Sequence, residues 1–148
     1  MIEVVFDTNV MVSALLWTGL PHRLLGLVES KEIELCATIE MLNELEVALA
    51  YEKFKPRIQM LETTVTELLE SMSQIVTIFS QEVKVKVVEI DPDDDIFLSC
   101  ALSSGAKYLV SGDRHLLDIG SFEEVNILSP RDFYEQAIDE KMKEEELA

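Results

Sequence analysis

The chain has 148 residues, of which 48% are hydrophobic, and its 12 Lys and Arg residues face 29 Asp and Glu residues, so the formal net charge is −17 at pH 7. No apolar run reaches the roughly 18 residues of a membrane-spanning helix, and the short acidic start differs from a secretory signal peptide, so we expect one cytoplasmic domain over residues 1–148 without a membrane segment. Because nucleic-acid-binding proteins usually carry a basic surface, the charge argues against tight nonspecific binding of RNA.

The first third of the chain alternates between strand-like and helix-like patterns. Residues 2–6 (IEVVF) are rich in β-branched side chains and predict a buried parallel strand, which a short helix follows over residues 9–16. Pro21 favours the start of the next helix. A second strand is predicted over residues 33–37, and Thr38 is suited to cap the helix that follows it.

The middle of the chain turns from helix to strand. Pro56 favours the start of an amphipathic helix that continues to about Met72. Residues 75–79 and 83–90 are both rich in β-forming side chains and are predicted strands. The Asp91-Pro92 pair ends the second of them, because the residue before a proline avoids the helical conformation.

The last third repeats the alternation. A helix is predicted over residues 93–104, with the glycine that follows it at the C-cap. Strands are predicted over residues 107–111 and 125–128. Pro130 then favours a terminal helix, whose acidic last part, residues 136–148, is expected to be a solvated helix face or tail.

Strands that alternate with helices predict an α/β fold, in which a parallel sheet has helices on both faces. Ligands bind to such sheets beyond the carboxyl ends of the strands. Asp7 follows the first strand, the acidic run 91–95 follows a later one, and Asp113 follows the strand over residues 107–111. We therefore expect these acidic groups to meet at one edge of the sheet.

Carboxylates that lie close together repel one another unless a cation neutralises them, and Mg²⁺ or Mn²⁺ prefers such oxygen ligands. Within the run 91–95, Asp94 shares a helix face with apolar residues at i+4 and i+7, so it is expected to face the sheet edge. Asp91 and Asp93 are expected to be caps or supporting groups, and Asp95 to point toward water. The sequence therefore predicts one divalent-metal site.

Further polar residues accompany these acids. Glu44 lies in the helix after the second strand, and its neighbours at i−3 and i+4 are apolar, so it either points inward or lies at the solvent boundary. Thr8, Asn9 and Ser111 stand beside the acids at the strand ends. They either position a carboxylate, a water or a phosphate oxygen, or serve as ordinary caps of loops and helices.

Four segments, in chain order, resemble the PIN-domain family and within it the VapC-like toxins of toxin–antitoxin systems: VVFDTN, NELEVAL, DPDDDIFLSCAL and YLVSGDRHLL. The resemblance runs from residue 2 to about residue 135. It implies a three-layer α/β/α sandwich with a central, mainly parallel sheet, and a pocket of acids that binds Mg²⁺ or Mn²⁺. It also implies hydrolysis of RNA, an antitoxin protein as partner, and a homodimer.

The resemblance also assigns roles to individual residues. It implies that Asp7, Asp94 and Asp113 bind the metal and that Glu44 holds a metal-activated water, which attacks the RNA phosphorus. Asn9 and Ser111 stand where the family has polar residues near the first and fourth acids, and Asp95 departs from relatives, which often carry Asn there. The four expected catalytic acids are therefore Asp7, Glu44, Asp94 and Asp113.

Two alternatives stay open. The segment VVFD also begins phosphatases of the haloacid-dehalogenase type, but those enzymes need a second Asp two residues after the first, where this chain has Asn9. The other alternative is a noncatalytic PIN-like binding module regulated by a partner, since the negative charge suits a basic partner peptide.

Overall fold

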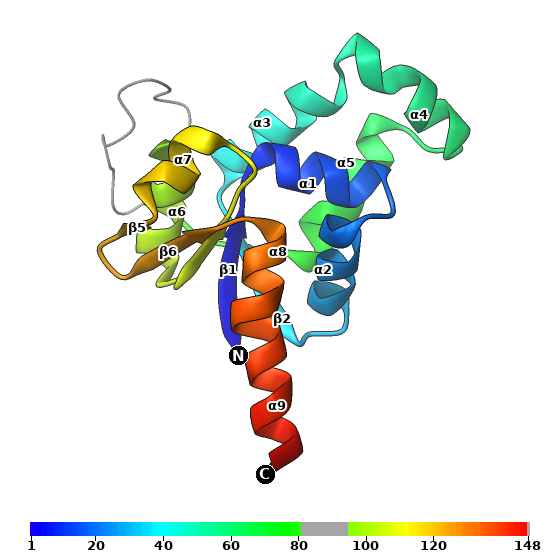
Figure 1. Cartoon of the computed structure of the whole chain (residues 1–148). Coiled ribbons are helices and arrows are strands. Elements are labelled where there is room, and N and C mark those ends of the chain that lie inside the picture. Colours follow the sequence, from blue (N-terminus) through cyan, green and yellow to red (C-terminus); the bar gives the residue numbers. More distant parts are fainter. Residues whose placement is uncertain (81–94, 148) are drawn as a thin grey trace.

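The computed structural model describes residues 1–80 and 95–147, and within them the strands form one six-stranded sheet in the order β3-β2-β1-β4-β6-β5 (Figure 1). The neighbouring strands pair in parallel, except that β5 is antiparallel to β6. The expected mainly parallel sheet is therefore confirmed. The strands are β1 (Ile2–Phe6), β2 (Ile33–Ala37), β3 (Thr77–Ile78), β4 (Tyr108–Val110), β5 (Ser121–Phe122) and β6 (Val125–Leu128).

Helices cover both faces of this sheet. Helix α2 contacts β2 and α8, and α8 contacts β4 and β6 on the same face, whereas α6 crosses β1, β2, β4 and β6 on the other face (Figure 1). This arrangement is the expected α/β/α sandwich. The helices are α1 (Thr8–Leu16), α2 (Leu20–Glu29), α3 (Ile39–Leu49), the 3₁₀ turn η1 (Glu52–Phe54), α4 (Lys55–Met60), α5 (Val65–Ile75), α6 (Asp95–Ser104), α7 (Arg114–Ile119), α8 (Pro130–Phe133), the π-helical turn η3 (Tyr134–Ile138) and α9 (Asp139–Leu147).

The core is centred on β1. Its last three residues, Val4, Val5 and Phe6, have no exposed surface, because helices cover both faces of the strand and β2 and β4 pair with its two edges. A run of large apolar side chains in a short strand is the pattern of a strand buried on both sides. In the described ranges, no single helix is long and apolar enough to cross a membrane, although α1 and α2 together, bent by 89°, would pass on length and composition alone.

Helices α3, α4 and α5 form an arm that extends beyond the sheet (Figure 1). The prediction of one helix from Pro56 to Met72 is wrong here. Helix α4 ends at Met60, Glu62 adopts a positive φ of 56°, and the Thr64 hydroxyl accepts a hydrogen bond from Glu67 N at 3.1 Å to cap α5. The positive φ of Glu62 follows the end of one helix and the Thr64 cap begins another, and periodicity alone reveals neither.

Smaller differences concern the edges of the elements. Ile75 belongs to α5, so β3 is shorter than the predicted strand over residues 75–79, and neither α7 nor the short edge strand β5 was predicted. The predicted strand over residues 83–90 and the first two residues of the helix predicted over 93–104 lie outside the described residues. The terminal helix begins at Pro130 as predicted and continues through η3 into the acidic α9.

Candidate active site

Among the parallel strands of the described residues, the strand order reverses between β1 and β4. From β1 the chain proceeds outward to β2 and β3, and it then returns through the sheet-covering α6 to β4 on the opposite side of β1. The carboxyl ends of β1 and β4 are therefore neighbours from which the chain departs in different directions. Such a point leaves a crevice at the sheet edge, which is where ligands bind in open α/β sheets.

Asp7 is the first residue after β1, and it is almost fully buried, with 4% of its surface exposed. One carboxylate oxygen, Oδ1, accepts a hydrogen bond from Val10 N at 2.8 Å, so Asp7 caps the N-terminus of α1. The other oxygen, Oδ2, accepts a hydrogen bond from the hydroxyl of Ser111, which directly follows β4. Two strands thus fix the orientation of one carboxylate.

Ser111 links Asp7 to Asp113. The Ser111 side chain is fully buried, and its backbone N donates to Leu128 O at 3.0 Å, which ties it to the end of β6. Its hydroxyl oxygen accepts a hydrogen bond from Asp113 N at 2.9 Å while its hydrogen is donated to Asp7. The half-buried Asp113 caps α7, where its Oδ1 accepts from His115 N at 2.7 Å.

The surroundings of Asp7 disfavour its charged form. Burial raises the pKa of Asp7 from its ordinary value of 3.8, the nearby negative charge of Asp113 raises it further, and hydrogen bonds from Ser111, Val10 and the Gly112 backbone lower it in part. A bound cation would offset both the burial and the repulsion. The backbone donors Val10 and Gly112 were not foreseen from the sequence, since their side chains carry no chemical signal.

The donor atoms at this edge fit a hard divalent cation. They are oxygens, and Thr8 Oγ1, which is buried beside Asp7, has no hydrogen-bond partner among the residues that the structure describes. Mg²⁺ and Mn²⁺ take such oxygen ligands. Within residues 1–80 and 95–147, no group of three or more His, Cys, Asp and Glu side chains is placed to hold a metal by itself. The expected third ligand, Asp94, lies outside these residues, as does Asp91.

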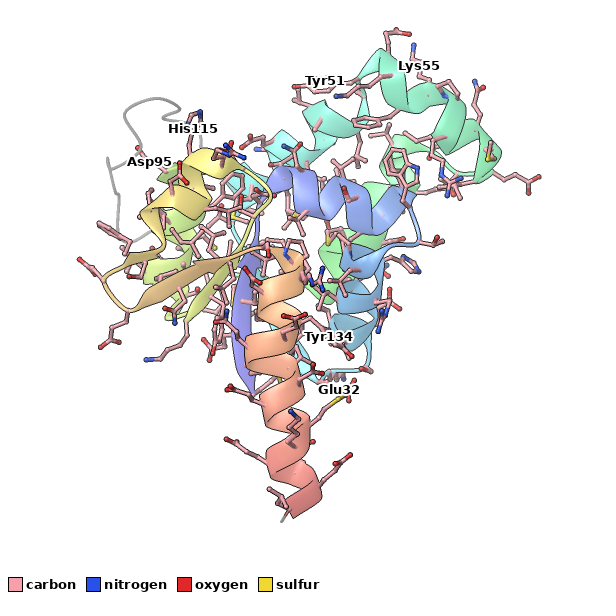
Figure 2. The ribbon with its side chains drawn as sticks, in the orientation of Figure 1. Glu32, Tyr51, Lys55, Asp95, His115 and Tyr134 are labelled. Carbon is pink, nitrogen blue, oxygen red and sulfur yellow. The ribbon has the colours of Figure 1, made fainter. Side chains whose placement is uncertain are left out.

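The remaining predicted residues have different environments. Glu44 is half-buried in α3, the helix that follows β2, whereas Asn9 is exposed in the first turn of α1. Asp95, which was expected to point toward water, is half-buried at the start of α6. Figure 2 shows Asp95 and His115 at the same end of the molecule, where α6 and α7 begin.

Known proteins share both the sequence pattern and the fold. The family model described as PIN domain matches residues 3–115 of this chain. The chain belongs to the PIN-domain family. The matched segment of this PIN domain includes Asp7, Ser111 and Asp113, so the hydrogen-bonded network at the sheet edge lies within the part that defines the family.

Two individual proteins are similar to this PIN domain. An uncharacterized protein of Methanocaldococcus jannaschii is 26% identical over 147 residues, which cover 91% of both chains. In the crystal structure of VapBC2 from Rickettsia felis bound to a DNA fragment from their promoter, one chain matches with a TM-score of 0.59 at 18% identity. That match covers 85% of this chain and 97% of the other, and it shows that the two share a fold.

Proposed function

We propose that this PIN domain is a Mg²⁺- or Mn²⁺-dependent endoribonuclease and the toxin of a toxin–antitoxin pair. The observation that carries the proposal is the network Asp113–Ser111–Asp7, which holds a buried carboxylate at the switch point of the sheet. PIN domains are a family of nucleases, and this network lies in the matched segment. We further propose that residues 1–148 form one domain with an acidic C-terminal helix.

The predicted acids have distinct tasks in the proposed reaction. Asp7 and Asp113 would hold the metal together with Asp94, which lies outside the described residues, and Glu44 would orient the attacking water. A bound divalent ion supplies activation of that water and neutralises charge on the phosphate as the phosphodiester bond breaks. Ser111 and the N-terminus of α1 hold the Asp7 carboxylate in one orientation, and the burial of Asp7 strengthens its attraction for a cation because the local dielectric is low.

An antitoxin partner and a homodimer belong to the same proposal. One similar solved structure is of VapBC2, which supports a partner protein for this chain. With a net charge of −17, the chain attracts a basic segment of such a partner. Family membership favours the nuclease over a phosphatase of the haloacid-dehalogenase type.

The test is cleavage of a panel of RNAs during a Mn²⁺ titration. We expect Asp7→Asn, Asp94→Asn and Asp113→Asn to lower the cleavage rate by at least about 100-fold. The matched control is Asp118→Asn, which removes an exposed acid from α7 and should leave the rate unchanged.

Two results would contradict the proposal. One is an Asp7→Asn protein that cleaves RNA at the full Mn²⁺-dependent rate. The other is a folded wild-type protein that cleaves none of the RNAs at any Mn²⁺ concentration, which would favour the noncatalytic binding module.

A further inference from the structure

A group of aromatic and cationic side chains, exposed except for the half-buried Phe54 and Arg57, lies where the arm meets the end of α1. Trp17 directly follows α1, whereas the other members lie between α3 and α4 or in the first turn of α4. We call this group the aromatic–cation cluster, and its members are Trp17, Tyr51, Lys53, Phe54, Lys55 and Arg57.

The three aromatic rings of the cluster contact one another in a row, which we call the ladder, with Phe54 between Trp17 and Tyr51. The Trp17 and Phe54 ring centroids are 5.9 Å apart in an edge-on arrangement, and Phe54 and Tyr51 are stacked with centroids 6.5 Å apart and planes 14° from parallel. Both ends of the ladder reach solvent, since Trp17 is 43% and Tyr51 51% exposed. Flat apolar surface held rigidly in water is suited to stack against another flat ring.

The cations of the cluster lie around this ladder. Lys53 Nζ lies 5.1 Å from the Phe54 ring centroid, and the Arg57 guanidinium carbon lies 5.8 Å from that of Trp17. Arg57 Nε also donates to Leu16 O at 2.6 Å, which fastens the start of α4 to the carboxyl end of α1. The cluster is therefore a fixed surface rather than a set of independent side chains.

This part of the chain is also its most basic. Residues 53–61 contain three cationic side chains and no acid, whereas no separate stretch of nine residues has a net charge above +1. Glu52 and Glu62 flank this stretch, and Glu52 pairs with Lys55 at 2.8 Å, so the uncompensated local charge is carried by Lys53 and Arg57. Electrostatic forces at physiological salt extend over about 8 Å, so the charge near the cluster counts for more than the total of the chain. A polyanion can therefore approach here in spite of the −17 total.

Stacking rings combined with cations are the features by which proteins hold single-stranded nucleic acid. Helix α1 connects the cluster to the active site, since its nine residues separate the Asp7 cap from Trp17 by about 15 Å along the helix axis. Tyr51 and Lys55 lie on the outer side of the arm, at the same end of the molecule as Asp95 and His115 (Figure 2). A strand of a few nucleotides spans this distance.

We propose that the aromatic–cation cluster is a binding platform for a single-stranded segment of the RNA substrate. Bases stack on Tyr51 and Trp17, and Lys53 and Lys55 contact the phosphates, so that the strand is led along α1 toward Asp7. The proposal rests on the proposed ribonuclease function, but RNA binding can be measured separately from cleavage.

The first experiment measures the Kd of a short fluorescent single-stranded RNA without divalent metal at several salt concentrations. Tyr51→Ala should weaken binding by about tenfold, because it removes one stacking ring, whereas Tyr51→Trp should retain affinity. The double variant Lys53→Gln/Lys55→Gln should reduce the slope of log Kd against log salt by about 1. The same RNA annealed into a duplex should bind more weakly, since its bases are already stacked.

Lys107→Gln is the matched control. Lys107 resembles Lys55 in exposure and pairing. The Lys107 side chain is 64% exposed and lies 3.3 Å from Glu124, and the Lys55 side chain is 59% exposed and lies 2.8 Å from Glu52. Lys107 precedes the amino end of β4, whereas Asp7 follows the carboxyl end of the parallel strand β1, so the two lie at opposite ends of the strands. The loss of Lys107 should leave the affinity for RNA unchanged. Thermal unfolding of each variant checks that the fold is kept.

The outcomes separate the platform from the nuclease. The platform proposal would be overturned if both Tyr51→Ala and the lysine double variant bound RNA with wild-type affinity. It would also be overturned if the cluster variants lost self-association in sedimentation but bound RNA normally. In cleavage assays the same variants should raise KM with little change in kcat; an unchanged KM refutes the platform and leaves the ribonuclease standing. Binding through the cluster without any Mn²⁺-dependent cleavage supports the platform and refutes the ribonuclease.

Discussion

Replacement of Ser111 by alanine tests the network that defines the candidate site. The variant removes a hydrogen bond to the buried Asp7 carboxylate, which contributes about 1.5–3 kcal/mol, and one from Asp113 N, which contributes about 0.5–1.5 kcal/mol. We therefore expect Ser111→Ala to lower the free energy of unfolding by about 2–4 kcal/mol. For a chain of this size the melting temperature should fall by roughly 5–15 °C.

The assay is thermal and urea unfolding at neutral pH without divalent metal. Ser73→Ala is the matched control, because the exposed Ser73 hydroxyl donates to Leu69 O at 2.8 Å within α5 and can exchange that bond for water. Its effect should stay below about 0.5 kcal/mol. If the melting temperature of Ser111→Ala lies within about 2 °C of the wild type, the network does not hold the site together.

A double-mutant cycle then tests how much of the stability lost in Ser111→Ala comes from the hydrogen bond to Asp7. In an Asp7→Asn background the acceptor is neutral, and a hydrogen bond to a neutral acceptor is weaker than one to a carboxylate. The cost of Ser111→Ala should therefore fall by about 1 kcal/mol in that background. Equal costs in both backgrounds would show that Ser111 acts independently of the Asp7 charge.

Three further predictions concern the same fold. Because burial raises the pKa of Asp7 above 3.8, Asp7 contributes a loss of stability to the folded metal-free chain as pH rises from that value through the folded pKa, and Asp7→Asn should make the decline of the unfolding free energy with pH shallower in urea titrations; an equal decline in the variant and the wild type contradicts the assignment. Thr8→Val should leave the metal-free stability unchanged or raise it, because Thr8 Oγ1 is buried without a hydrogen-bond partner in the described ranges, and a loss above about 1 kcal/mol in thermal unfolding would reveal a partner. Gly105→Ala should destabilise by about 1–2 kcal/mol because φ is +79°, whereas Gly26→Ala inside α2 should stabilise by about 0.5–1 kcal/mol; equal effects in urea unfolding would rule out backbone strain as the cause.

The sequence by itself determined the elements whose signals are local. The β-branched run of β1, the Thr38 cap of α3 and the glycine at 105 that ends α6 depend on neighbours within a few residues, and each is confirmed. The interruption between α4 and α5 is also local. The Thr64 hydroxyl accepts a hydrogen bond from Glu67 N and so starts a new helix there, which the spacing of apolar residues does not predict.

The sequence also predicted, from the order of its strands and helices, a site of strand-end acids, and the metal-binding and catalytic roles of Asp7, Glu44, Asp94 and Asp113 stay predictions. Only the tertiary structure decided which residues meet. Asp7 and Ser111 are 104 positions apart, and their hydrogen bond exists because β1 pairs with β4 in a register that places Phe6 opposite Val110. In the same way Arg57 reaches Leu16 across 41 positions.

Such contacts follow from the order and register of the strands. That order and register are determined by the burial of the whole sheet and not by any local sequence pattern. The sequence thus determined which acids stand at strand ends, and the tertiary structure determined that Asp7 is buried, that Ser111 joins it to Asp113, and that the exposed Trp17 ring lies about 15 Å along α1 from it.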